Sequence, residues 1–232
     1  MVKCILFDLD NTLLLKKPSV PEKIYEMLSL VIPNIQYKTI EHAYADGELW
    51  TGIQIRKENE TGILMSDEEF AENLLVCYGK YISMTDEISE SLISILSGKY
   101  SYRYEVMSFA YEVLDLLKKK EIKLGIVSNN YSNIRDILNS LNLASYFDCI
   151  LISEETGISK PDPRILIKAC EELDVSVNDT IYVGDHPFDI LCAHSANMKV
   201  AWFPPNKYYM IPKYVSEPDW RIVSLKDLLD LL

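Results

Sequence analysis

Five short apolar runs, rich in β-branched residues, lie in two separate parts of the chain, residues 1–15 and 105–232. They are Lys3–Phe7, Lys123–Ser128, Asp148–Ser153, Thr180–Gly184 and Lys199–Phe203. Their length, and the Gly, Ser or Asp that closes most of them, are typical of buried β-strands. Because segments of helical periodicity separate them, the pattern predicts an α/β fold whose mainly parallel sheet is covered by helices on both faces.

Three helices are expected between these strands. Residues from Phe109 to Lys120 place apolar side chains on one face and lysines near the end, where the helix dipole favours cations. A second helix is predicted after Asn130. A third is predicted after Pro163, a residue suited to the first helical turn.

Residues 17–103 have a different pattern, with helical periodicity and no convincing buried strand. Four helices are predicted, near Glu22–Val31, Thr39–Ile55, Asp67–Ile82 and Asp86–Leu96. A helical block inserted after the first strand predicts a second, smaller domain. We therefore expect residues 1–16 and 104–232 to form the core domain and residues 17–103 to form the helical domain.

Charge and composition exclude several classes of protein. The formal net charge of −12 would repel a nucleic-acid backbone, so no nucleic-acid partner is expected. No apolar run approaches the roughly 18 residues of a membrane helix, and acidic residues interrupt the first apolar run too early for a signal peptide. The five cysteines form no Cys-x-x-Cys pair, and the three histidines lack zinc-ligand spacing with them. These features predict a soluble cytoplasmic protein with reduced thiols and no membrane association.

Polar side chains follow the first and second predicted strands. Asp8 and Asp10 belong to an Asp-x-Asp-x-Thr motif at the carboxyl edge of the sheet, where open α/β folds bind ligands. Alone, this motif also fits a turn with capping Asp and Asn residues. Ser128 and Asn129 precede a helix, so a hydroxyl and backbone N–H groups are available there to hold a phosphate. A simple helix N-cap is the alternative.

Two further motifs lie later in the chain. Lys160 precedes two closely spaced prolines, which would hold this cation on a stiff loop, although an isolated lysine is more often solvated. Asp185 follows Gly184 at a strand end, and Asp189 lies four residues further on. Two carboxylates at this spacing repel, which predicts a nearby cation or donor network, unless they merely cap a helix. His186 is either a solvated loop residue or a substrate contact.

Together the motifs occur in a fixed order at the ends of four strands: Asp-x-Asp-x-Thr, Ser, Lys-Pro and Gly-Asp-x-x-x-Asp. As a set they resemble the haloacid dehalogenase superfamily, and in particular its phosphatases with an α-helical cap inserted after the first strand. The resemblance covers essentially the whole chain. It implies a Rossmann-like core, a helical cap, Mg²⁺ as cofactor and a small-molecule phosphate monoester as substrate.

The resemblance also implies a role for each motif residue. Asp8 would be the nucleophile that forms an aspartyl-phosphate, and Asp10 would be the general acid and then the general base. Ser128 and the Asn129 amide would hold phosphate oxygens. Lys160 would offset negative charge on Asp8 and on the phosphoryl group.

Mg²⁺ would be bound by the Asp8 carboxylate, the Asp10 backbone carbonyl and Asp185. Asp189 would support these ligands from behind rather than bind the metal as they do. Physical reasoning supports the same arrangement. An anionic nucleophile that attacks a dianionic phosphate, in a chain of net charge −12, needs concentrated positive charge. Mg²⁺ together with Lys160 would supply it.

Other activities on the same fold remain as alternatives. A 2-haloacid dehalogenase typically lacks an acid at the position of Asp10, because its carbon-centred reaction needs no leaving-group acid, so Asp10 favours a phosphatase. A phosphosugar mutase shares all four motifs. A catalytically silent binding protein would be expected to lose at least one of Asp8, Asp10, Lys160 or Asp185, and all four are present.

Substrate choice is expected to depend on residues 17–103, because such caps exclude water and select the leaving group. Four side chains there either face the site or belong to the bundle core or its solvated surface: Tyr44, Trp50, Arg56 and Lys57. The sequence singles out no particular phosphomonoester and no oligomeric state.

Overall fold

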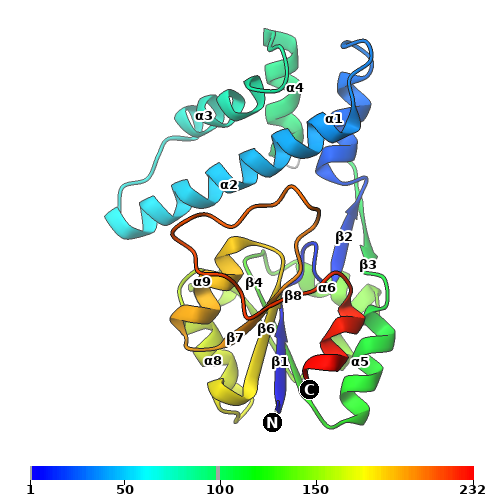
Figure 1. Cartoon of the computed structure of the whole chain (residues 1–232), viewed down its shortest axis with the longest axis vertical. Helices are drawn as coiled ribbons and strands as arrows, with labels where there is room; N and C mark the ends of the chain where they lie inside the picture. Colours follow the sequence, from blue (N-terminus) through cyan, green and yellow to red (C-terminus); the bar gives the residue numbers. More distant parts are fainter. Residues whose placement is uncertain (1, 98–99) are drawn as a thin grey trace. The chain divides into compact units, whose positions relative to one another are not determined.

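A six-stranded parallel sheet forms the centre of the larger of two units in the computed structural model, which describes residues 2–97 and 100–232 (Figure 1). The strand order is β5-β4-β1-β6-β7-β8, and every neighbouring pair is parallel. The strands are β1 (Cys4–Phe7), β4 (Lys123–Ser128), β5 (Cys149–Ile152), β6 (Thr180–Gly184), β7 (Lys199–Trp202) and β8 (Trp220–Arg221). The predicted parallel α/β fold is confirmed.

The central strand β1 is completely buried and pairs with β4 on one side and β6 on the other. The chain builds outward from β1 through β4 and β5, and then returns to add β6, β7 and β8 on the opposite side. In open α/β sheets, this reversal opens a crevice at the carboxyl ends of the strands. The ends of β1, β4 and β6 therefore define the place where a ligand is expected.

Helices cover both faces of this sheet (Figure 1). One face carries α5 (Ala110–Lys119), α6 (Ile134–Ser140) and η3 (Leu225–Leu231), and the other carries α8 (Arg164–Glu172) and α9 (Pro187–Ser195). The shorter helical turns are η1 (Ala144–Tyr146), α7 (Ser153–Thr156) and η2 (Val177–Asp179). Buried Val113 and Leu117 of α5 pack in the same core cluster as Ile5 and Phe7 of β1, which explains the helical periodicity of that segment.

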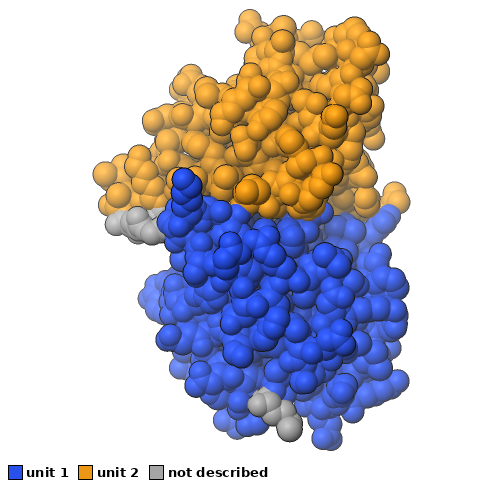
Figure 2. All heavy atoms as spheres, viewed as in Figure 1, with its two compact units in different colours: residues 1–15, 104–205, 211–232 blue, residues 16–103, 206–210 orange. Residues whose placement is uncertain are grey.

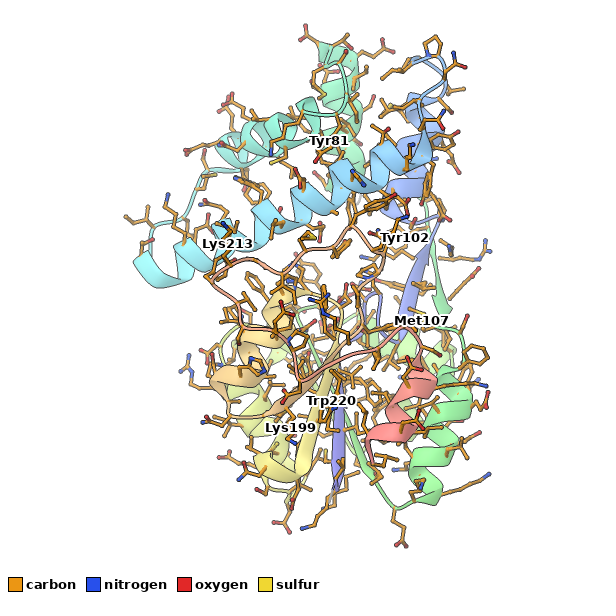
Figure 3. All side chains as sticks on the ribbon, viewed as in Figure 1. Tyr81, Tyr102, Met107, Lys199, Lys213 and Trp220 are labelled. Carbon is orange, nitrogen blue, oxygen red and sulfur yellow. The ribbon has the colours of Figure 1, made fainter. Side chains whose placement is uncertain are left out.

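The outer edge of the sheet ends in β8, which the sequence did not predict because its two residues form no apolar run. Two basic side chains cover aromatic rings there. Lys199 and Trp220 are labelled near this edge in Figure 3. The Lys199 ammonium lies 5.2 Å from the centre of the Trp220 ring, and the Arg221 guanidinium lies 4.8 Å from the centre of the Trp202 ring. These cation–π contacts cover apolar surface at an edge that would otherwise be open.

The smaller unit is helical, with α1 (Val20–Leu28), α2 (Tyr37–Thr61), α3 (Asp67–Gly79) and α4 (Asp86–Leu96). Its own core contains buried side chains from all four helices, including Ile24, Ile40, Tyr78 and Leu92. Within the described part of the chain, no helix is long and apolar enough to span a membrane.

The two units are residues 1–15, 104–205 and 211–232, and residues 16–103 and 206–210 (Figure 2). The boundaries after residues 15 and 103 fall inside β2 (Leu14–Lys17) and β3 (Arg103–Val106). These two strands pair with each other. The sequence placed residues 206–210 in the core domain, whereas they lie in the helical unit. The ring of Tyr208 meets His42 of α2 at a centroid distance of 3.7 Å, which explains the difference.

Candidate active site

The predicted site residues meet at the carboxyl edge of the sheet, within the larger unit. Asp8 directly follows β1, Ser128 ends β4 and Asp185 directly follows β6, so parallel strands bring them to one level. Lys160 arrives from the loop between α7 and α8. Asp8, Lys160 and Asp185 are each only 5–6% exposed, so their charges interact away from bulk water.

Three acceptors surround the Lys160 ammonium. Nζ donates to Asp8 Oδ1 at 2.7 Å, to Asp189 Oδ1 at 2.7 Å and to the Tyr182 hydroxyl at 2.9 Å. Because an ammonium carries three protons, these contacts match its full donor capacity. Burial alone lowers the pKa of Lys160, but the charges of Asp189 and Asp8 outweigh it and place this pKa well above its ordinary value. The side chain is therefore a fixed positive charge.

The backbone of Lys160 is held as firmly as its ammonium. The Asn129 side chain donates to the Lys160 carbonyl at 2.9 Å and accepts from the Lys160 N–H at 2.8 Å. The sequence analysis assigned only the backbone amide of Asn129 to phosphate, and it missed this bidentate contact. Nothing in the local sequence marks it, because the two residues are 31 positions apart.

Two amide side chains contact the acidic residues, one from the turn after β1 and one from the segment after β4. Asn11 has a φ of 57°, a left-handed conformation that asparagine tolerates, and its Nδ2 donates to Asp185 Oδ2 at 3.2 Å. Asn130 Nδ2 lies 3.4 Å from Asp10 Oδ2. The sequence analysis gave neither asparagine a role in the site, although Asn11 lies inside the Asp-x-Asp-x-Thr motif and Asn130 directly follows Asn129.

Asp189 lies fully buried in the first turn of α9 and uses both carboxylate oxygens. Oδ1 accepts from Lys160, and Oδ2 accepts from the His186 backbone N–H at 2.9 Å. His186 caps the helix, because its Nδ1 accepts from the Phe188 N–H at 3.1 Å. The sequence analysis offered two interpretations of this motif, a nearby cation or a helix cap, and both apply to Asp189. It pairs with Lys160 and also caps α9. A substrate contact for His186 stays a prediction.

Asp8, Asp185 and Asp189 form a cluster in which candidate ligand oxygens lie within 4.8 Å of one another. Burial raises the pKa of Asp185 well above its ordinary value, and the charges of Asp8 and Asp189 raise it further. Burial also raises the pKa of Asp8, even though the charge of Lys160 acts in the opposite direction. One ammonium therefore does not neutralise the cluster, and the carboxylates fit a hard divalent cation such as Mg²⁺.

A family model described as haloacid dehalogenase-like hydrolase matches residues 5–203. The chain belongs to this family. A pyrophosphatase PpaX of Anoxybacillus flavithermus is 26% identical over all of this chain and 97% of its own length. A glyceraldehyde 3-phosphate phosphatase of Pyrococcus furiosus is 32% identical, over 62% of this chain and 61% of that protein. The expected family and a hydrolase activity are thereby confirmed.

Solved structures of this family share the fold. The HAD-hydrolase YfnB of Bacillus subtilis, bound to magnesium, has a TM-score of 0.65 at 20% identity and covers 100% of this chain and 98% of its own. An L-2-haloacid dehalogenase of Xanthobacter autotrophicus has a TM-score of 0.62 at 16% identity, with the same coverage. The fold alone therefore does not tell whether a member of this family hydrolyses phosphate esters or removes halides. That distinction depends on the side chains in the site.

Removing one carboxylate should stabilise the metal-free protein. The raised pKa of Asp185 means that the folded state keeps this proton to higher pH than the unfolded state, so stability falls as pH rises above about 4. In EDTA at neutral pH, we expect Asp185→Asn to raise the Tm by about 2–4 °C for each kcal/mol of repulsion relieved. The difference from the unsubstituted protein should shrink as the pH is lowered.

Thermal unfolding with EDTA or with MgCl₂ between pH 5 and 8 measures these effects. Mg²⁺ should raise the Tm of the unsubstituted protein more than that of Asp185→Asn. Asp230→Asn, which makes the same charge change at an exposed position, is the control and should move the Tm little. A lower Tm for Asp185→Asn in EDTA, or an unchanged response to Mg²⁺, would contradict the charge argument.

A methyl group at Gly184 should disturb the Lys160 network. A Cβ there would overlap the Asp189 carboxylate, so Asp189 would have to leave its contacts with Lys160 and His186. We expect Gly184→Ala to destabilise the protein by about 1–3 kcal/mol, measured by chemical denaturation. Gly79→Ala is the control, because its Cβ would only meet the Met84 side chain at an ordinary 3.6 Å. Equal stability of the two variants would refute the prediction.

Proposed function

We propose that this chain hydrolyses small phosphate monoesters with Mg²⁺, through a phosphoryl group carried transiently on Asp8. The observation that carries the proposal is the buried contact of 2.7 Å between Asp8 and the permanently charged Lys160, with Asp10 two residues further on. The relatives named as a phosphatase and a pyrophosphatase support phosphoryl chemistry. The magnesium-bound neighbour supports the choice of metal.

In the first step, a carboxylate oxygen of Asp8 attacks phosphorus and the bond from phosphorus to the ester oxygen breaks. Asp10 gives its proton to the departing oxygen, which leaves as an alcohol. The Ser128 hydroxyl and the Asn129 backbone N–H donate hydrogen bonds to phosphoryl oxygens. Lys160, already in contact with Asp8, offsets the negative charge that gathers on the phosphoryl group.

In the second step, water attacks the same phosphorus atom. Asp10, now a carboxylate, removes the proton from that water, and the bond between phosphorus and Asp8 breaks. Inorganic phosphate is released, the Asp8 carboxylate is restored, and Asp10 again carries a proton. The two steps therefore consume one ester and one water, and no other reactant is needed.

The carboxylates of Asp8 and Asp185, two members of the acidic cluster, would hold Mg²⁺ together with the Asp10 carbonyl, and the ion would supply positive charge to the reaction. Asp189 stands behind these ligands, because both of its oxygens accept hydrogen bonds from the protein. Its role is to fix Lys160 and the start of α9.

Asp10 distinguishes the proposed reaction from dehalogenation on the same fold. A halide ion leaves without a proton, whereas an alkoxide needs one. Asp10, two residues after the nucleophile Asp8, is the acid that can supply it. A phosphosugar mutase would use the same residues and differ only in whether a sugar hydroxyl replaces water in the second step. We propose hydrolysis as the outcome.

We also propose that the helical unit is the cap that selects the substrate. Trp50 packs against Phe70 at a centroid distance of 5.0 Å, and Tyr44 is hydrogen-bonded to Glu48, so both have partners inside this unit. Lys57 is exposed. The side chain of Arg56 lies outside the described residues.

A phosphate-release assay over a panel of metabolite monoesters and pyrophosphate, with Mg²⁺ present, tests the proposed activity. We expect turnover of at least one monoester, its loss in EDTA, and a loss of at least roughly 10³-fold in Asp8→Asn, which keeps the shape but not the attacking charge. Acid quenching followed by mass spectrometry should detect phosphate on the peptide that contains Asp8. Activity on pyrophosphate alone, or chloride release from 2-chloropropionate, would contradict the proposal.

Chemistry and selectivity should separate by mutation. Lys160→Ala should lower kcat/KM for every substrate by a similar factor, because Lys160 contacts the nucleophile and not the leaving group. Trp50→Ala should change the ranking of substrates while it alters p-nitrophenyl phosphate hydrolysis less. A matrix of kcat/KM values measures both effects, and the opposite pattern would show that the helical unit is not the specificity element.

A further inference from the structure

Tyr182 lies at the centre of the buried network, although the reaction steps above give it no part. It belongs to β6 and is completely buried. Its hydroxyl accepts a hydrogen bond from Lys160 Nζ at 2.9 Å and donates one to the Val127 carbonyl at 2.9 Å. Since the single hydroxyl proton is directed at Val127, a lone pair of the oxygen faces the ammonium.

The position of this hydroxyl follows from the strand order. β1 lies between β4 and β6, and Leu6 of β1 pairs with Gly125 on one side and Tyr182 on the other. The Tyr182 side chain therefore reaches across β1 to Val127, the residue before Ser128. One hydroxyl connects the strand that precedes Asp185, the strand that ends in Ser128, and the lysine that contacts Asp8.

The chemical nature of this third acceptor matters as much as its place. Lys160 already contacts two carboxylates, and a third anion would compete with a phosphoryl group for the ammonium. A neutral hydroxyl fixes the direction of the third N–H without adding negative charge. It also satisfies a donor that would be costly to leave unpaired in a buried site.

We propose that Tyr182 is a positioning residue that holds the Lys160 ammonium against Asp8 in the geometry required for phosphoryl transfer. This inference rests on the proposed function, because it assigns Tyr182 an effect that acts only through Lys160. Tyr182 touches neither the leaving group nor the attacking water in this scheme. Its removal should therefore slow every substrate by the same factor.

Tyr182→Phe tests the inference, because it keeps the ring and removes only the hydroxyl. We expect kcat to fall by about 10- to 100-fold, as when a hydrogen-bond partner that orients a metal ligand is lost, with a smaller change in KM. The loss should be the same for aryl and alkyl esters whose leaving groups differ in acidity. Tyr146→Phe, which removes a hydroxyl bonded to exposed Asp115 at 3.0 Å, is the matched control and should keep full activity.

A double-mutant cycle with Lys160→Ala decides whether Tyr182 acts through Lys160. In the Lys160→Ala background, measured by single-turnover release of nitrophenolate, Tyr182→Phe should cause no further loss. An equal loss in both backgrounds, or full activity of Tyr182→Phe alone, would overturn the inference. If Lys160→Ala itself kept normal activity, or if no ester were hydrolysed, the proposed function would have failed instead.

A measurement on the unsubstituted protein covers the case in which Tyr182→Phe does not fold. The ammonium protons of Lys160 should exchange slowly enough to give a ¹H–¹⁵N signal, with nuclear Overhauser contacts to the Tyr182 ring. We expect this signal in the Mg²⁺-loaded protein with and without inorganic phosphate. Rapid exchange, or the absence of a contact to Tyr182, would refute the positioning role.

Discussion

The burial of one ammonium among carboxylates is the interaction on which the rest of the site depends. Removing charges from water is costly, and the cost is offset only when partners are placed with good geometry. The partners of Lys160 come from the end of β1, from β6 and from α9, so the sheet register must be correct for any of them to meet. A slip of one residue in β1 would turn Asp8 to the opposite face of the sheet.

Excess negative charge in the site lowers the stability of the metal-free protein and favours the binding of a cation. The carboxylates exceed what Lys160 can neutralise, and the pKa of Asp185 is raised first by burial and then by the charges of Asp8 and Asp189. The surrounding chain reduces the repulsion with neutral donors, such as the Asn11 amide on Asp185 and the His186 backbone N–H on Asp189. The remaining imbalance favours a divalent cation, so the stability of the fold and the affinity for metal are linked.

The sequence predicted most of the core fold, because buried strands leave continuous apolar runs. It also placed the candidate site residues at the ends of those strands, and the structure brings them together at one edge of the sheet. It underestimated α2, which extends from Tyr37 to Thr61, because its last turns are polar and carry no apolar periodicity. It gave no sign of Tyr182 as a partner of Lys160 or of the Asn129 clamp. Those contacts join residues 22 and 31 positions apart, and only the strand order brings them together.

The way the two units interrupt each other also sets the order in which a nascent chain can fold. β1 leaves the ribosome first but has no neighbour until β4 and β6 follow, and the helical unit lacks its Tyr208 contact until residues 206–210 are made. At roughly 5–20 residues per second, the gap of about 100 residues between the two parts of the helical unit takes on the order of 5–20 s. The completely buried strand Cys4–Phe7 has its own wait, because its partner β4 begins only at Lys123 and its partner β6 only at Thr180. A translational pause before β4 would therefore prolong the exposure of this apolar strand.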